Sequence, residues 1–309
     1  MLRRIIQIGL SLLGLYVVLS IAAGIYLAEA AIHPHRKPVT GRARYMAMVK
    51  SYSSSGLEDV AIDAAHHAEL KGWYVRPNDW NHEAVILLHG VADDREGVAG
   101  YSVMFLKAGY AVLLPDSRAQ GESSGTLATY GVLERNDVAQ WTEWLRQRMD
   151  GCTYLFGESM GAAIALQAMT VTHGLCAVVV ESPFSTFREI AYDRIAQTTG
   201  TGSAFSRTVI RPMLEAALLY VRLRYDVTLA DAQPAAAVAA SPVPALLIAG
   251  MADRNIPARH AVAIMRTAPA EDALWEIARA DHGGAARAAG LMFDSRVLGW
   301  FRSHHTPAS

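Results

Sequence analysis

The stretch Tyr154-Leu155-Phe156-Gly157-Glu158-Ser159-Met160-Gly161 decides the fold of this 309-residue chain. It passes from an apolar run through the pattern Gly-x-Ser-x-Gly into an alanine-rich segment, residues 160–171, that is predicted to be a helix. A serine on so tight a strand-to-helix turn has strained backbone angles, so the residues two before and two after it must be very small. Gly157 and Gly161 meet this demand. The stretch therefore predicts a nucleophile elbow with Ser159 at its tip.

A serine hydroxyl is a poor nucleophile until a base takes its proton, so a carboxylate and a histidine are expected further along the chain, in that order. Asp253 follows the apolar run 245–249, and His282 follows the run 274–277. Both lie at the carboxyl ends of predicted parallel strands, where open α/β sheets build their sites. Asp281 is the alternative acid, but neighbouring residues on a turn seldom aim at the same point. We therefore expect a catalytic triad of Ser159, Asp253 and His282.

Continuous apolar runs alternate with helical stretches along most of the chain. Such runs are typical of parallel strands that are buried on both faces. The pattern predicts an α/β fold with a mostly parallel central sheet flanked by helices. The predicted strands are an opening hairpin at 60–62 and 70–75, followed by 84–88, 111–114, 153–156, 177–180, 245–249 and 274–277, and the predicted helices are 100–108, 133–148, 160–171 and 257–267.

About sixty residues separate the predicted strands ending near Glu181 and starting near Ala245. Helical character occurs at 186–196 and 206–224. A connection of this length is too long for a simple crossover. We expect a small helical cap, inserted at about 183–241, over the active edge of the sheet.

Residues 5–28 contain no charged residue. As a helix they would span roughly 36 Å, enough for a hydrocarbon core of about 30 Å. Arg3 and Arg4 precede this segment, and Ala28-Glu29-Ala30 has the form of a signal-peptidase site. The segment exceeds the roughly 7 to 15 apolar residues of a signal peptide, which favours an uncleaved membrane anchor over residues 1–29. Secretion after cleavage near Ala30 is the alternative.

Residues 30–56 are polar and broken by two prolines, and are predicted to be a linker to a hydrolase domain at 57–309. Basic residues on the two sides of the apolar segment nearly balance. A first segment with a short basic start more commonly keeps its amino terminus inside. We therefore expect a single-pass protein of the cell membrane with its large domain on the extracytoplasmic, periplasmic side.

Composition excludes several classes of protein. The chain has 28 Lys+Arg against 29 Asp+Glu and only 18% charged residues, where about 25% is usual. Without a clustered basic face, nucleic-acid binding is excluded. Two cysteines are too few for a disulfide scaffold or for a cysteine-based zinc site. We expect no metal and no cofactor.

The chain from about residue 56 onward resembles the α/β-hydrolase superfamily, most closely its BEM46-like and serine-aminopeptidase-like serine hydrolases. The resemblance is carried by the elbow, the acid and the histidine, by His89-Gly90-Val91 and by the segment 116–123. It implies that the backbone N–H groups of Val91 and Met160 form an oxyanion hole. It also implies attack by Ser159 on an acyl carbonyl, with an acyl-enzyme that water hydrolyses. The family usually has histidine where this chain has Gln120, in a loop that is structural in the family.

Cys152 and Cys176 stand at the starts of two successive predicted strands, which are neighbours in this fold. Strands about 4.8 Å apart can bring two cysteines within bonding range, and an extracytoplasmic domain would permit the bond. Both a disulfide and two free buried thiols are compatible with the sequence.

These features favour a membrane-anchored serine hydrolase that cleaves an ester, a thioester or a small amide of a small-molecule acyl substrate. Apolar residues of the cap point weakly to a lipid-like substrate. A serine aminopeptidase is one alternative, and it would need an acid in the cap to hold the substrate's α-amine. A non-catalytic hydrolase-fold binding protein is the other. The candidate cap acids are Glu189, Asp193, Glu215 and Asp226.

Overall fold

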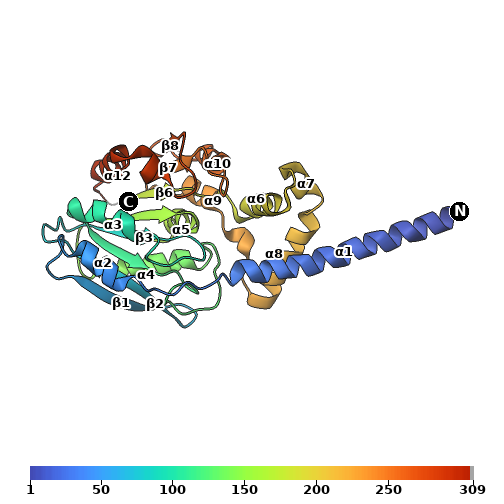
Figure 1. The fold of residues 1–309 in the computed structure, drawn as a ribbon, viewed down its shortest axis with the longest axis horizontal. Coiled ribbons are helices and arrows are strands. Elements are labelled where there is room, and N and C mark those ends of the chain that lie inside the picture. The colour runs from blue at the N-terminus through green and yellow to red at the C-terminus, as the bar shows by residue number, and fades with distance from the viewer. Residues whose placement is uncertain (307–309) are drawn as a thin grey trace.

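The computed structural model describes residues 1–306 and has an eight-stranded sheet between two layers of helices (Figure 1). The strand order is β1-β2-β4-β3-β5-β6-β7-β8, with β1 antiparallel to β2, β2 antiparallel to β4, and all other pairs parallel. The strands are β1 (Leu57–Ala64), β2 (Ala68–Val75), β3 (Ala84–Leu88), β4 (Ala111–Pro115), β5 (Thr153–Glu158), β6 (Leu175–Glu181), β7 (Ala245–Gly250) and β8 (Ala273–Ile277). The predicted α/β-hydrolase fold, with its mostly parallel sheet, is confirmed.

Thirteen helical elements surround this sheet in the described residues. They are α1 (Leu2–Ile32), α2 (Arg42–Val49), α3 (Ala99–Lys107), α4 (Glu134–Arg146), α5 (Met160–Ala168), α6 (Phe187–Thr199), α7 (Ser203–Thr208), α8 (Arg211–Tyr225), the 3₁₀ turn η1 (Leu229–Asp231), α9 (Pro234–Ala240), α10 (Arg259–Met265), α11 (Ala285–Ala289) and α12 (Leu291–Ser303).

Both faces of the sheet are packed. In β3, Val85 and Leu87 point into a core shared with α3 and α12, whereas Ile86 and Leu88 point into a core shared with α4 and α5. A strand buried on both sides has no solvent-facing position, which explains why these strands are continuous apolar runs.

Four α-helices of the described residues were not predicted: α2, α9, α11 and α12. Helix α2 lies inside the stretch 30–56 that was expected to be a linker, and its Tyr45 is buried and stacked on Trp73 with ring centroids 5.0 Å apart. Helix α12 buries Phe293, Val297 and Phe301 against the sheet. In α2 only Tyr45 and Val49 are buried, a pattern too short to recognise as amphipathic.

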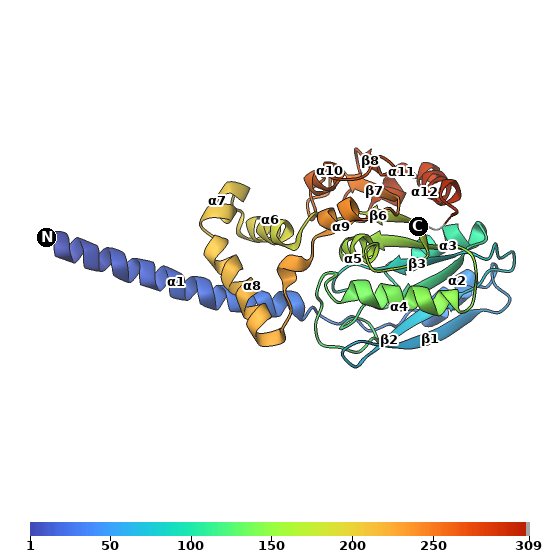
Figure 2. The same ribbon diagram turned by 180° about the vertical axis from the view of Figure 1, so that it is seen from behind.

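The insertion between β6 and β7 forms a cap of α6, α7, α8 and η1 (Figure 2). The helical stretch expected at 206–224 is divided into α7 and α8, with Pro212 in the first turn of α8. Helix α9 lies within the predicted insertion, but its Val238 is buried in the core shared with α5 and α10. The cap proper is therefore shorter than the expected 183–241.

Helix α1 is long and apolar enough, by length and composition, to cross a membrane. It projects from the body, and its carboxyl end lies against α8 (Figures 1 and 2). Four of its residues, spaced every fourth position, are buried: Ser20, Gly24, Ala28 and Ile32. A Cβ added to Gly24 would lie 2.4 Å from the Met213 carbonyl oxygen, so only glycine lets the two backbones approach this closely. The helix continues three residues beyond the expected end of the anchor at residue 29.

A disulfide joins Cys152, just before β5, to Cys176 in β6, with a Cα–Cα distance of 5.7 Å. The two strands are parallel neighbours. Of the two alternatives compatible with the sequence, the structure has the bonded one.

Candidate active site

Ser159 stands between β5 and α5 with φ 57° and ψ −115°, a strained conformation for a residue with a side chain. A Cβ added to Gly157 would lie 2.4 Å from the Gly161 carbonyl oxygen. A Cβ added to Gly161 would lie 2.1 Å from the Leu88 carbonyl oxygen. Both contacts are with backbone that cannot move aside. The elbow therefore requires glycine on both sides of Ser159, for the steric reason that the motif predicts.

The structure brings Ser159, Asp253 and His282 together at the carboxyl edge of the sheet. His282 Nε2 lies 3.0 Å from Ser159 Oγ, and His282 Nδ1 lies 2.8 Å from Asp253 Oδ2. Asp281, the alternative acid, instead pairs with Arg287 at 2.7 Å on the surface. The three side chains are arranged so that His282 can accept the Ser159 proton while Asp253 holds the other ring nitrogen.

Asp253 is fixed by four hydrogen bonds. Its Oδ1 accepts the backbone N–H groups of Asn255 and Ile256 at 2.8 and 2.9 Å. Its Oδ2 accepts the Ser182 hydroxyl at 2.7 Å as well as His282. Burial opposes ionisation, but the hydrogen bonds and the charge of His282 outweigh it and lower the pKa of the Asp253 carboxyl. Sequence reasoning missed Ser182, whose only signal is its place directly after β6.

Two further acids lie near His282. The Tyr101 hydroxyl donates to Glu181 at 3.1 Å and lies 3.4 Å from Glu158. Burial raises the pKa of Glu181 to about 7 and also raises the pKa of Glu158. Burial would lower the pKa of His282, but Asp253, Glu158 and Glu181 together raise it above its ordinary value. Protonated His282 is therefore stabilised by these three carboxyl groups.

Of the two residues whose backbone N–H groups are expected to form the oxyanion hole, Met160 directly follows Ser159 and Val91 directly follows Gly90. Met160 is the first residue of α5, and the first N–H groups of a helix have no acceptor within it. Gly90 lies beside the nucleophile, because a Cβ added to it would be 3.5 Å from the Ser159 Cβ. Val91 and Met160 both line the cavity that contains Ser159.

His89 orients the Val91 N–H. The Ser117 backbone N–H donates to His89 Nε2 at 3.0 Å, so Nδ1 carries the proton and donates to the Gly90 carbonyl at 2.8 Å. In a trans peptide the C=O and the following N–H point in opposite directions. Holding the Gly90 oxygen therefore also holds the direction of the Val91 N–H.

Gln120 replaces the family's usual histidine and has a structural role in the same loop. Its Oε1 accepts the Ala92 backbone N–H at 2.6 Å, and its side chain is fully buried. Ala92 has φ 57°, so this loop is strained and held by side-chain contacts. The loop that contains Ala92 is therefore held in place although this chain has Gln120 where the family usually has histidine.

Ser159 and His282 open into a cavity of about 780 Å³. Its floor is the sheet edge, and its other walls come from the cap and the carboxyl end of α1. The lining from α6 and α8 is mainly apolar, with Arg194 of α6 as a charged exception, and the chain from α1 onward adds apolar side chains up to Pro34, followed by His35. The apolar wall residues are Phe187, Ile190, Ala191, Ile195, Met213, Leu214, Ala217, Leu218, Leu27, Ala28, Ala30, Ala31 and Pro34.

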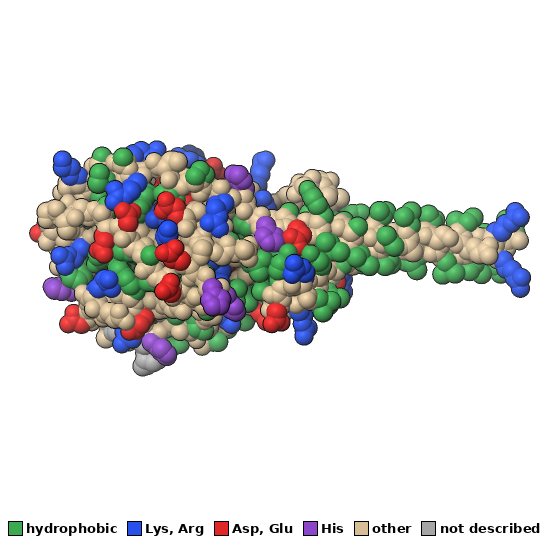
Figure 3. Space-filling model, turned by 90° about the horizontal axis from the view of Figure 1, so that it is seen from below, with side chains coloured by type: hydrophobic (Ala, Val, Ile, Leu, Met, Phe, Trp, Pro, Cys, Tyr) green, Lys and Arg blue, Asp and Glu red, His purple; other side chains and the backbone are tan. Residues whose placement is uncertain are grey.

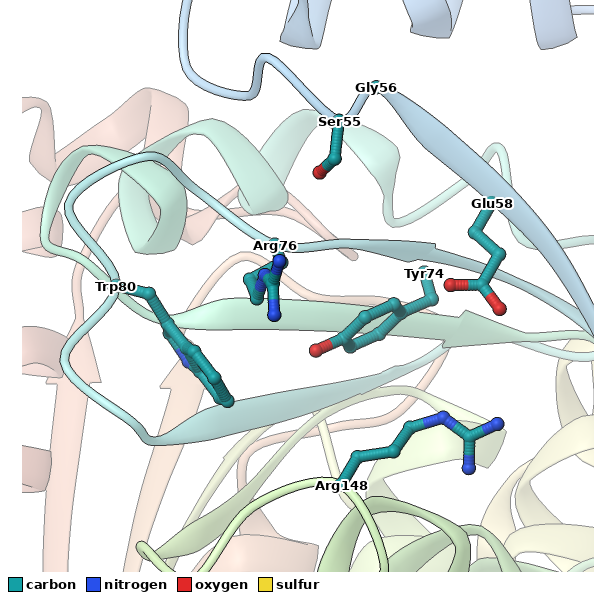
Figure 4. Close-up of a pocket in the computed structure, with 7 residues that line it drawn as sticks. All are labelled: Ser55, Gly56, Glu58, Tyr74, Arg76, Trp80 and Arg148. Carbon is teal, nitrogen blue, oxygen red and sulfur yellow. The ribbon is translucent and has the colours of Figure 1, made fainter.

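A second, smaller cavity of about 300 Å³ lies between the hairpin and the end of α4 (Figure 4). Trp80 precedes β3 and Arg148 precedes β5, so this cavity is at the amino edge of the parallel strands, opposite Ser159. It contains none of the predicted site residues. Its lining residues are Ser55, Gly56, Glu58, Tyr74, Arg76, Trp80 and Arg148.

A second serine–histidine–aspartate set, which sequence reasoning missed, joins the cap to the core. His260 Nδ1 accepts the Ser185 backbone N–H at 3.2 Å, and His260 Nε2 lies 3.0 Å from Asp193. All three residues are buried, and none of them lines the cavity around Ser159. Since no substrate can reach it, this set stabilises the junction of α6 with α10.

The sequence profile of the Alpha/beta hydrolase family matches residues 85–294. This chain belongs to the alpha/beta hydrolase family. The uncharacterized protein YqkD of Bacillus subtilis is 29% identical over 201 residues, which cover 63% of each chain. The uncharacterized protein Rv2307c of Mycobacterium tuberculosis is 32% identical over 136 residues, which cover 43% of this chain and 47% of that relative. The matched part is thus less than two thirds of either relative.

Solved structures of other alpha/beta hydrolases share the fold. The esterase Pf2001 of Pyrococcus furiosus has a TM-score of 0.68 and 21% identity, with 88% of this chain and 97% of that chain covered. Acetyl xylan esterase 1 of Thermoanaerobacterium has a TM-score of 0.58 and 15% identity, with 90% of this chain and 98% of that chain covered. At these identities the likeness establishes the fold alone. The substrate has to be inferred from the geometry of the site.

Proposed function

We propose that this alpha/beta hydrolase is a membrane-anchored serine hydrolase that cleaves a carboxylic ester through an acyl-enzyme. The observation that carries the proposal is the contact of His282 with Ser159 Oγ at 3.0 Å and with Asp253 at 2.8 Å. A nucleophile in contact with a base, which a third group orients, is the arrangement that activates a serine.

The reaction then proceeds in two balanced halves. His282 Nε2 takes the Ser159 proton as Oγ bonds to the acyl carbon, and the proton passes to the alcohol oxygen as the acyl C–O bond breaks. Water next gives a proton to His282 and its hydroxide bonds to the acyl carbon; Ser159 leaves and recovers the proton. The N–H groups of Val91 and Met160 stabilise the oxyanion that forms in each of the two steps. Loss of one such hydrogen-bond donor typically lowers the rate about 10²–10³-fold.

The pairing of the cap acids supports an ester over an aminopeptidase substrate. Asp193 pairs with Arg259 and His260, Glu189 with Arg207 and Arg259, and Glu215 with Arg188. None of these acids, nor Asp226, lines the cavity. A substrate α-amine would thus find no cap carboxylate beside Ser159. The carboxylates that do line the cavity, Asp93 and Glu158, come from the loop after β3 and from the end of β5.

Helix α1 supports the membrane anchor, and the disulfide supports an extracytoplasmic domain. The apolar face of α1 is exposed over most of its length, and Figure 3 shows basic side chains at its amino-terminal tip, where the sequence has Arg3 and Arg4. Disulfides persist in oxidising compartments such as the periplasm. The bond between Cys152 and Cys176 fits a domain on that side.

Labelling of the full chain by a fluorophosphonate tests the proposal. We expect wild-type protein to label, Ser159→Ala to lose all labelling, and Ser185→Ala to keep it. Ser185 is the matched control because it is also a serine hydrogen-bonded to a histidine, but in the buried set. A folded wild-type chain that does not label would support a non-catalytic binding protein instead. Faster cleavage of aminoacyl anilides than of p-nitrophenyl esters would favour the peptidase.

A further inference from the structure

We propose that the substrate is an ester lipid of the bilayer that holds α1, and that its acyl chain reaches Ser159 along the carboxyl end of this helix. The inference rests on the proposed function and adds the substrate class and its route of entry. Four observations carry it: the fixed wall that α1 contributes, the length of α1 left free, the apolar surface of the cap, and the division of polarity inside the cavity.

The carboxyl end of α1 is a fixed wall of the cavity. The Tyr130 hydroxyl donates to the Ala31 carbonyl and the Ala128 N–H to the Ile32 carbonyl, both at 2.9 Å. Glu29 accepts the hydroxyls of Tyr220 and Tyr225, at 2.6 and 2.7 Å. A side chain that points from this wall into the cavity therefore stays in place, and anything moving along α1 from its apolar part arrives beside Ser159.

Much of α1 is exposed, and its length can be compared with the thickness of a membrane. Residues 2–19 are all exposed, and the charge-free residues 5–19, which follow Arg3 and Arg4, span roughly 22 Å at 1.5 Å per residue, against a hydrocarbon core of about 30 Å. Ser20 is the first buried residue of α1, and the Tyr16 hydroxyl donates to the Val209 carbonyl of the cap. The cap therefore meets α1 within the length of helix that a hydrocarbon core would cover, which places the cavity at the membrane face.

The cap leaves large apolar side chains exposed. Leu219 and Leu223 of α8 are 55% and 77% exposed, and Phe205 and Val209 near the end of α7 are 46% and 42% exposed. Figure 3 shows that apolar side chains run along α1 and continue onto the body next to it. Such a surface is stable when it is buried in the interface of a bilayer.

Within the cavity, α1 and α8 contribute apolar side chains, whereas Glu158, Ser159 and His282 come from the sheet edge. Further polar side chains line it from other elements: His35, Asp93, Arg194 and Asn255. An apolar chain can thus lie against α1 and α8 while the polar end of an ester lies at Ser159. At about 780 Å³ the cavity is near the upper end of the 300–1,000 Å³ typical of small-molecule sites. The cavity is large enough to hold an acyl chain against the apolar side chains of α1 and the cap, with its carbonyl carbon at Ser159.

The test uses the full chain in vesicles of dioleoyl phosphatidylcholine. Two esters that release the same p-nitrophenol are compared: the palmitate, which resides in the bilayer, and the acetate, which is dissolved in water. Ala31→Phe places a ring in the cavity from the α1 wall. Ala22→Phe is the matched control, because Ala22 is exposed and lies nine residues, or two and a half turns, away on the opposite face of α1.

We expect Ala31→Phe to lower the ratio of palmitate to acetate kcat/KM at least tenfold, and Ala22→Phe to leave this ratio within twofold of wild type. Fluorophosphonate labelling of Ser159 shows that each variant is folded, and Ala31→Leu serves if Ala31→Phe does not label. A ratio unchanged in a labelled Ala31 variant, or a wild-type chain that labels and cleaves acetate but not palmitate, overturns the inference alone. A folded wild-type chain that neither labels nor cleaves either ester overturns the proposed function, and this inference with it.

Discussion

At the scale of single residues, His282 lies near carboxyl groups whose pKa values are shifted in opposite directions, that of Asp253 downward and that of Glu181 upward. Asp253 is held by four hydrogen bonds that favour its charged form. Glu181 is buried, which raises its pKa to about 7, so that near neutral pH it is only partly charged. His282 must be neutral to accept the Ser159 proton, and these carboxylates favour its protonated form. The working pH of the site therefore depends in part on Asp253 and Glu181, which do not line the cavity.

This balance predicts a pH profile. Because the pKa of His282 is raised above 6.5, kcat/KM for p-nitrophenyl acetate should fall with acid through a midpoint above that value. Glu181→Gln removes a negative charge near the imidazolium and keeps an acceptor for the Ala285 N–H. We expect it to move the midpoint to lower pH in a profile measured from about pH 5 to 9.

Glu143→Gln is the control for this profile. Glu143 is exposed on α4 and pairs only with Arg146 among the ion pairs of the described residues, so its replacement should leave the midpoint where it is. A midpoint that stays fixed or rises in Glu181→Gln would show that Glu181 does not act on His282.

At the scale of elements, the crossing of α1 and α8 couples the apolar helix to the cap. Ser20, Gly24 and Ala28 keep one face of α1 narrow, and small residues at this spacing let two helices approach closely. The face of α8 in this contact contains Leu214, Ala217, Leu218 and Val221, all buried in one cluster with Ala28 and Ile32. The cap is thus packed on α1 as well as on the sheet.

Gly24→Leu should separate this crossing, because its Cβ would lie 2.4 Å from the Met213 carbonyl oxygen and 3.1 Å from the Ala217 nitrogen. Overpacking of this kind costs about 1–3 kcal/mol. For a chain of this size we expect the Tm in detergent to fall by roughly 2–12 °C. Tryptophan fluorescence during heating measures this change.

The matched variant is Gly14→Leu, which makes the same replacement on the same helix at a position with nothing within 4 Å. It should leave the Tm unchanged. Equal effects of the two substitutions would mean that the contact between α1 and the cap does not contribute to stability.

At the scale of the whole molecule, α1, the cap and the sheet share one cavity. Cleavage near Ala30 would remove Leu27, Ala28 and Ala30 from its wall. It would also remove Glu29, the acceptor for the hydroxyls of Tyr220 and Tyr225. The structure thus gives a physical reason to favour the retained anchor over the secreted alternative.

Retention predicts a mature chain that still carries residues 1–30 and stays with membranes through an alkaline carbonate wash. Intact-mass measurement of protein extracted from its own cells checks this outcome. A soluble form that begins near Ala31 would contradict it.

In the same measurement we expect Cys152 and Cys176 to resist alkylation until a reductant is added, as the disulfide requires.

The sequence by itself determined the strands, the elbow and the order of the triad, because each of these is a local pattern. A buried parallel strand must be continuously apolar, and the turn at Ser159 needs glycine at 157 and 161 whatever surrounds it. Asp253 and His282 were predictable because the carboxyl ends of parallel strands meet at one edge.

Only the tertiary structure decided which distant groups touch. Ser182 on Asp253, His260 between Ser185 and Asp193, and the bond between the two cysteines all join residues far apart in the chain. The same holds for the end of α1, whose apolar residues look alike in sequence whether they face lipid or a cavity. Hydropathy depends only on the residues of a segment. Whether that segment lines a site depends on which other parts of the chain pack against it.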